Sequence, residues 1–178
     1  MGKKFEVHVQ STIFGQQELL ALGNKVSGLS LAIDQNKLEA ILQRLVPKDI
    51  KDMPYFLGFS SYYRNHIKNV SHISSSLYRL CSTYVVFEIT KERIDAYERI
   101  KNELTNAPVL ILPDFELPFE LYIASSCSQR LGAALHQREI VHGEPREGVI
   151  WYISRKLKYS EAWYGATQNE CLGLFWAL

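Results

Sequence analysis

The stretch that decides the fold is FELYIASSCSQRLGAALHQ, residues 119–137. Phe119, Leu121 and Ile123 alternate with other residues at the period of a half-buried β-strand. A polar run at 125–129 interrupts this pattern, and apolar residues then return from Leu131 onward. We therefore predict a β-hairpin here.

Upstream of this hairpin the apolar period is that of helices. Asp34 can cap a helix that runs to Val46, and Pro47 would end it. A second helix is expected to begin at Asp52, because Pro54 is tolerated only in a first turn. The inward faces of these two helices are predicted to be Leu38, Ile41, Leu42 and Leu45, followed by Phe56, Ser60, Tyr63 and Ile67.

Two more helices are predicted before the hairpin. One covers residues 73–80. The other is capped by Thr90, ends at Asn106 and Pro108, and directs Ile94, Tyr97, Ile100 and Leu104 inward. After the hairpin we expect a strand at about 148–154 and a helix at 161–178. Residues 5–9 are read as a short strand.

These elements predict an α+β protein, with a helical unit followed by an antiparallel three-stranded sheet and a helix. We place the boundary near residues 84–88. The expected units are a tail at 1–33, a helical unit at 34–85 and a mixed unit at 86–178.

Composition narrows the class of protein. The chain has 178 residues, 47% apolar and 22% charged, as in soluble globular proteins. Its net charge of +1 offers no strong field for a polyanion, so nucleic-acid contacts would need local patches. Cys81, Cys127 and Cys171 stand alone, which argues against a disulfide framework or a zinc site. We expect an intracellular protein, cytoplasmic or nuclear, with no membrane partner.

Several segments in a fixed order carry a resemblance to a known family. They are LGNKVSGLSLAIDQNKLEAI at 22–41, FLGFSSYYRNHI at 56–67, LTNAPVLILPDFELPF at 104–119, the hairpin, WYISRKL at 151–157, and Glu161-x-x-Tyr164 leading to Glu170. Their order resembles the gypsy-type LTR-retrotransposon Pol polyproteins. The first two segments resemble the end of the palm and the thumb of the reverse transcriptase, the third its connection, and the rest the start of its RNase H domain. The resemblance implies a family that performs RNA-directed DNA synthesis and cleaves RNA–DNA hybrids.

The resemblance also implies where catalytic residues should stand. The family binds Mg²⁺ through an aspartate on the first RNase H strand, a glutamate on the first helix and later aspartates. Aligned through Gly132, Ser125 replaces the first aspartate, whereas Glu170 keeps the position of the glutamate. On the residues alone, the favoured interpretation of Glu170 is a solvated helix charge; the resemblance implies instead that it keeps the family's position.

The printed sequence stops at Leu178, before the family's later aspartates, and lacks the Tyr-x-Asp-Asp motif of the polymerase. We expect this chain to be catalytically inactive alone and to hold no metal. Mg²⁺ is implied only for the intact family. An active RNase H with substituted ligands remains an alternative, although neither Asp114 nor Glu120 has a spacing that replaces Ser125.

Nucleic-acid contact remains as a second kind of function. Tyr62, Arg64 and Lys68 combine an aromatic face with positive charge on one predicted helix, and Arg155 and Lys156 form a second basic cluster. Solvated charges would give the same pattern. We predict weak binding to an RNA–DNA hybrid or template–primer duplex, and a non-catalytic binding module of nucleic acid or protein is the alternative. Because the last predicted helix is rich in apolar residues, we also expect self-association or binding to the rest of a polyprotein.

Overall fold

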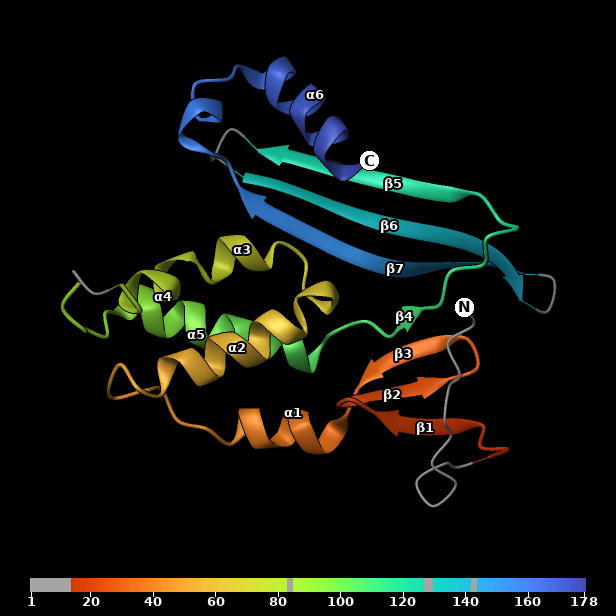
Figure 1. The fold of residues 1–178 in the computed structure, drawn as a ribbon, viewed down its shortest axis with the longest axis horizontal. Coiled ribbons are helices and arrows are strands. Elements are labelled where there is room, and N and C mark those ends of the chain that lie inside the picture. The colour runs from red at the N-terminus through yellow and green to blue at the C-terminus, as the bar shows by residue number, and fades with distance from the viewer. Residues whose placement is uncertain (1–13, 83–84, 127–129, 142–143) are drawn as a thin grey trace, which may run out of the picture.

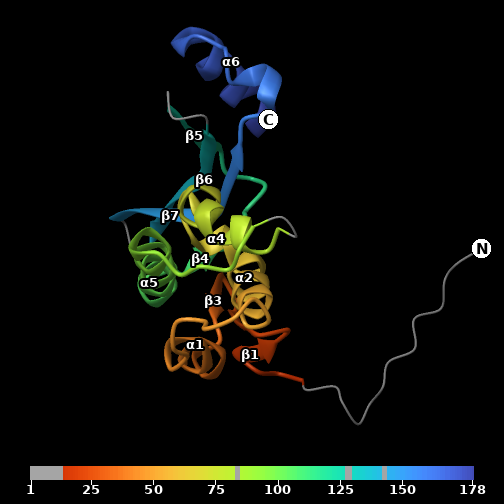
Figure 2. The same cartoon turned by 90° about the vertical axis from the view of Figure 1, so that its left-hand side faces the viewer.

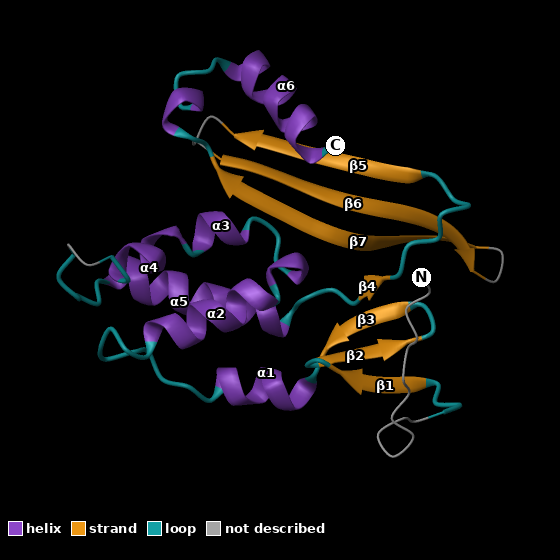
Figure 3. Ribbon diagram, viewed as in Figure 1, coloured by secondary structure: helices purple, strands orange, loops and turns teal. Residues whose placement is uncertain are grey.

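The computed structural model describes residues 14–82, 85–126, 130–141 and 144–178. It confirms the α+β class: two antiparallel sheets flank a group of helices (Figures 1 and 3). The strand predicted at residues 5–9 lies outside the described residues. Within the described residues, no helix is both long and apolar enough to cross a membrane.

The first sheet is small and has the order β1-β2-β3-β4. Its strands are β1 (Glu18–Ala21), β2 (Asn24–Ser27), β3 (Ser30–Ile33) and β4 (Leu110–Ile111). The turn between β1 and β2 places Leu22 at φ 51° and Gly23 at φ 78°, the left-handed geometry of tight hairpins. The Tyr63 hydroxyl donates to the Gly23 carbonyl oxygen at 2.5 Å, so this turn is tied to the helices that follow.

The helical unit contains α1 (Gln35–Leu42), α2 (Met53–Tyr62), the 3-10 turn η2 (Arg64–His66), α3 (Val70–Ile73), α4 (Ser75–Leu80) and α5 (Lys91–Thr105). The Asp34 side chain caps α1 through the Asn36 N–H, as predicted. Helix α2 begins directly after Asp52, also as predicted. The shared core draws its fully buried side chains from α1, α2, α4 and α5: Ile41, Met53, Phe56, Leu77, Leu80, Tyr97, Ile100 and Leu104.

Three helix predictions were wrong in detail. Helix α1 ends at Leu42, where the Arg44 N–H donates to the Ile41 carbonyl oxygen in a tighter turn, and Leu45 is 82% exposed. The Arg44 and Leu45 carbonyl oxygens accept hydrogen bonds from Lys101 and Tyr97 of α5. The helix predicted at 73–80 is two short helices that meet at Ser74, whose hydroxyl donates to the Val70 carbonyl oxygen. Ile94, predicted to face inward, is 37% exposed.

The second sheet has the order β5-β6-β7 and confirms the predicted hairpin. Strand β5 (Phe119–Ser126) pairs with β6 (Arg130–Val141), and β6 pairs with β7 (Glu144–Lys156). Strand β7 is longer than the predicted 148–154 because its pairing with β6 continues through the second hairpin. A bulge lies between them: Leu135 pairs with Trp151 and His136 pairs with Val149, which leaves Ile150 as the extra residue.

The last helix begins later than predicted. A 3-10 turn, η3 (Tyr159–Glu161), precedes α6 (Ala166–Ala177), so the predicted start at Glu161 was wrong. The cause is the Glu161 carboxylate, which accepts the Lys158 backbone N–H at 2.7 Å and closes a separate turn. Figure 2 shows α6 and α1 at opposite ends of the molecule, with the sheet and the other helices between them.

The helical unit packs directly on the second sheet. Both η2 and α3 contact β7, and the Ser71 N–H donates to the Ser154 hydroxyl at 3.1 Å. Asn69, at φ 56°, sets its side-chain oxygen so close to Gly132 that a Cβ at this position would clash with it. Helix α5 packs against α1, α3 and α4, although the predicted boundary assigned it to the second unit.

Candidate nucleic-acid interface

The residues that resemble the nuclease's catalytic pair come from β5 and α6. The Ser125 backbone pairs with Leu131 in the ladder between β5 and β6. Glu170 is exposed on α6 and lines a shallow groove with Ile123 and Ala124 of β5. Glu170 therefore lies beside the expected strand, but the strand offers it no acidic neighbour.

This donor set does not fit a pair of magnesium ions. Such a site needs several carboxylates to hold two ions about 4 Å apart. The single carboxylate of β5 is Glu120, which is bound by Arg138 and Tyr122. Among the residues that the structure describes, no group of three or more His, Cys, Asp or Glu side chains could hold a metal ion.

Arg155, predicted to bind nucleic acid, is engaged inside the protein. Its guanidinium donates two hydrogen bonds to the Glu161 carboxylate, at 2.7 and 3.1 Å. It also lies 5.4 Å from the centre of the Trp176 ring. The hydrogen bonds from Arg155 and from the Lys158 N–H lower the pKa of Glu161 to about 2. Arg155 thus connects β7 to η3 and α6.

Tyr62 is half exposed at the end of α2, and its hydroxyl donates to the Leu22 carbonyl oxygen. The same hydroxyl accepts from the Asn24 side chain at 3.2 Å. Its neighbour Tyr63 is buried, and burial raises its pKa to about 12. The hydroxyl end of Tyr62 is thereby fixed, while part of its ring stays open to solvent.

The remaining predicted basic residues are exposed where the helical unit meets the sheet. Arg64 lies in η2 and Lys68 in the turn before α3, and both elements pack beside β7. Lys156 lies near the end of β7, opposite Arg130 of β6. Arg130, which the sequence analysis missed, bonds to His72. The structure therefore brings Arg64, Lys68 and Lys156 to elements that border one sheet edge, with Arg130 on the adjoining strand.

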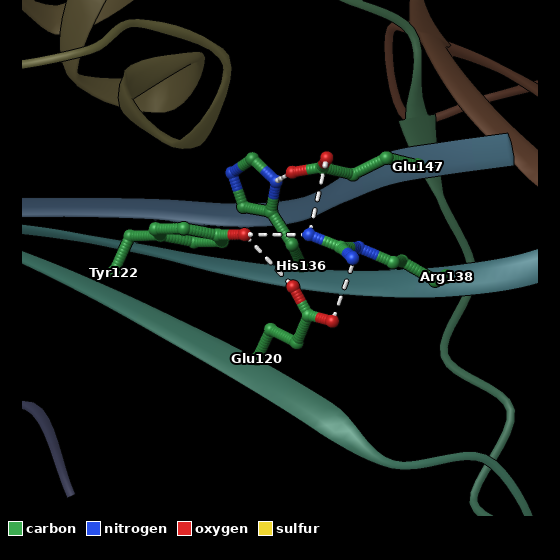
Figure 4. Close-up of polar contacts among 5 residues, drawn as sticks. All are labelled: Glu120, Tyr122, His136, Arg138 and Glu147. Atoms are coloured by element: carbon green, nitrogen blue, oxygen red, sulfur yellow. Dashed lines mark hydrogen bonds and ion pairs between the residues drawn. The ribbon is translucent and has the colours of Figure 1, made fainter.

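A polar cluster on the sheet was also missed. We call Glu120, Tyr122, His136, Arg138 and Glu147 the sheet cluster; they come from all three strands and point toward one another (Figure 4). Arg138 bonds Glu120 at 3.1 Å, Tyr122 donates to Glu120 at 2.8 Å, and His136 bonds Glu147 at 2.8 Å. The hydrogen bond to Glu120 raises the pKa of Tyr122. The sequence pattern does not indicate the cluster, because the register of three strands brings its members together.

Comparison with known proteins shows the family to which this chain belongs. Residues 89–178 match the family described as RNase H-like domain found in reverse transcriptase, just over half of the chain. The Pol polyproteins of the Drosophila melanogaster transposons 412 and gypsy are each 31% identical over 97% of the chain. The chain spans 14% and 17% of their lengths.

A solved structure shares the fold. The foamy viral protease-reverse transcriptase in complex with dsDNA superposes with a TM-score of 0.76 over 91% of this chain and 33% of that one, at 21% identity. The same viral protein in complex with an RNA/DNA hybrid gives a TM-score of 0.74, at 20% identity over 91% of this chain and 21% of that one. This chain belongs to the RNase H-like domain family of reverse transcriptases and corresponds to a segment of retrovirus-related Pol polyproteins.

Proposed function

We propose that this chain is a non-catalytic segment of a retroelement reverse transcriptase that contacts the template–primer duplex or RNA–DNA hybrid. One observation carries the proposal: the family fold is kept, while Ser125 of β5 stands where the family has its first aspartate, and Ile123 and Ala124 are the β5 residues that line the groove with Glu170. Glu170 alone cannot organise two metal ions.

Duplex contact is assigned to Tyr62, Arg64, Lys68 and Lys156. All four are exposed; Arg64 and Lys68 lie on segments that border β7, and Lys156 is the last residue of β7. The likeness to polymerase structures that hold dsDNA or an RNA/DNA hybrid supports this assignment. Arg155 is left out of the contact surface, because its guanidinium is bound to Glu161, and we give it a structural role.

The binding experiment uses a fluorescent RNA–DNA hybrid and the full chain. Affinity should be weak, and its logarithm should fall with the logarithm of salt concentration by about 0.9 for each phosphate neutralised. The triple variant of Arg64, Lys68 and Lys156 to alanine should flatten this slope. Lys37→Ala, at an exposed lysine of α1, is the matched control. A slope that is the same in the triple variant and in Lys37→Ala would refute the assignment.

The cleavage experiment tests the loss of nuclease chemistry with the same hybrid. We expect no cut in Mg²⁺ or Mn²⁺, either from the wild type or from Ser125→Asp, since two carboxylates still leave a second ion poorly held. Metal-dependent cleavage that is lost in Glu170→Gln would instead establish an active RNase H with substituted ligands.

A further inference from the structure

A cleft of about 510 Å³ lies between the helical unit and the second sheet. Lys68 and Asn69, from the turn before α3, form one wall. Strands β5, β6 and β7 form the other wall, which includes Tyr122, His136 and Tyr152. Its volume is in the range of small-molecule sites, which run from about 300 to 1,000 Å³.

The wall formed by the sheet presents two aromatic side chains on either side of a small residue. Tyr122 pairs with Ala134 in the ladder, and Ala134 pairs with Tyr152, so two tyrosines flank a small residue on one face. Tyr122 is 45% exposed, and its ring centre lies 4.8 Å from that of His136. Burial raises the pKa of Tyr152, while the hydrogen bond to Glu120 raises that of Tyr122, so both rings stay neutral near pH 7.

The charged side chains around the cleft favour a ligand whose anionic group lies at the wall formed by Lys68 and Asn69. The two carboxylates of the sheet cluster already have cationic or hydrogen-bonding partners: Glu120 is bound by Arg138, and Glu147 lies 2.8 Å from His136. Lys68 is exposed on the opposite wall, and within the described part of the chain no ion pair engages its ammonium group. A ligand with an aromatic ring at one end and a negative group at the other matches this layout.

We propose that the cleft binds a single nucleotide, with its base against the Tyr122 ring and its phosphate at Lys68. Hydroxyl groups of the sugar then face the Glu147 and His136 side chains. Stacking of a base on an aromatic side chain tolerates any base, because every base has a π-face. The ligand is either a free nucleoside monophosphate or the end nucleotide of a strand. This goes beyond the duplex surface, with which it shares only Lys68.

The test titrates adenosine 5′-monophosphate into the isotope-labelled full chain and follows amide NMR shifts. Shifts should gather at the turn 68–69 and at 132–136 of β6. Tyr122→Ala should weaken binding by about fivefold or more, the effect of losing one stacking partner, while Tyr122→Phe keeps the ring and the affinity. Lys68→Ala should weaken the nucleotide but leave adenosine, which has no phosphate, unchanged. Lys37→Ala is the control for charge.

Several outcomes overturn the inference. These are no shifts at millimolar nucleotide, shifts located away from the cleft, or equal affinity of the wild type and a folded Tyr122→Ala variant. A single-stranded oligonucleotide that shifts the same amides at lower concentration than the mononucleotide would identify a strand end as the ligand; equal or weaker binding would identify the free nucleotide.

The same variants separate this inference from the proposed function. Arg64→Ala and Lys156→Ala should weaken the duplex and leave the mononucleotide unaffected, and Tyr122→Ala should do the reverse. Duplex binding without cleft shifts would overturn the cleft inference alone. Cleft shifts without duplex binding would overturn the duplex proposal alone.

Discussion

Helices α2 and α6 are both rich in apolar residues, yet they are held in the fold in different ways. Helix α2 buries Met53, Phe56 and Leu57 in the shared core. Helix α6 buries only Asn169 and Gly173, while Phe175 is 84% exposed. The Arg155–Glu161 ion pair joins β7 to the turn before α6, and α6 itself packs on β5 and β6. Apolar content alone therefore does not tell which helix supplies the stability.

The largest expected effect tests this contrast with two phenylalanines. Phe56 is 1% exposed and its ring centre lies 4.1 Å from that of Tyr97, so Phe56→Ala should lower the free energy of unfolding by about 3–5 kcal/mol. Phe175→Ala should change it by no more than about 0.5 kcal/mol. Urea titration followed by circular dichroism measures both. Similar losses in the two variants would remove the distinction between the helices.

At low pH, α6 should lose its protection from hydrogen exchange before the helical unit does. The pKa of Glu161 is about 2 in the folded chain against an ordinary 4.5, so its stabilising effect is complete above about pH 4.5 and is lost as the pH falls toward 2. Hydrogen bonds to charged groups contribute about 1.5–3 kcal/mol. Exchange protection factors over α6 should fall in this window while those of α5 persist. Glu161→Gln should show low α6 protection even at pH 6; unchanged protection would contradict the role of the pair.

A smaller effect is expected at the hairpin that anchors the helical unit. Gly23 has φ 78°, and a Cβ there would lie 2.8 Å from the Tyr63 hydroxyl, so Gly23→Ala should cost about 1–2 kcal/mol. Gly58→Ala, in α2 with open space around it, should stabilise by about 0.5–1 kcal/mol. Thermal unfolding compares the two. Equal shifts in Tm would show that the turn imposes no constraint.

The exposed face of α6 should affect association more than stability. Leu174, Phe175 and Leu178 are 48%, 84% and 90% exposed. We expect the chain to self-associate at micromolar concentration and Phe175→Ser to reduce this without changing the unfolding midpoint. Sedimentation velocity provides the measurement, with Tyr55→Ser, at a half-exposed tyrosine of α2, as the control. A wild type that stays monomeric would contradict the expectation.

The periodic elements of the fold could be predicted, because each depends on neighbours in sequence. Asp34 and Asp52 marked helix starts correctly, and the alternation from Phe119 located β5. The errors arose at helix ends, where local turns decide the bounds. The Arg44 N–H bonds the Ile41 carbonyl oxygen in a tighter turn at the end of α1, and the Glu161 carboxylate bonds the Lys158 N–H and closes a separate turn before α6.

The site could be predicted only where a residue stands in a recognised motif. The resemblance to the family placed Glu170 on a helix, and the structure sets that helix beside β5. The hydrogen bonds from Arg155 to Glu161 could not be predicted, because a run of basic residues does not indicate which carboxylate each residue contacts. The sheet cluster and its cleft depend on the register of three strands, which the sequence pattern does not specify.

The bulge at Ile150 sets the phase of β7. Tyr152 shares a face with Tyr122, and five positions of strict alternation would place Glu147 on the opposite face. The extra residue reverses the parity, so Glu147 opposes Arg138 and joins Tyr152 on the same face. Deletion of Ile150 would move the side chains of residues 144–149 of β7 to the opposite faces of the sheet. A single codon therefore decides whether the sheet has a polar cluster beside a cleft or a carboxylate on its other side.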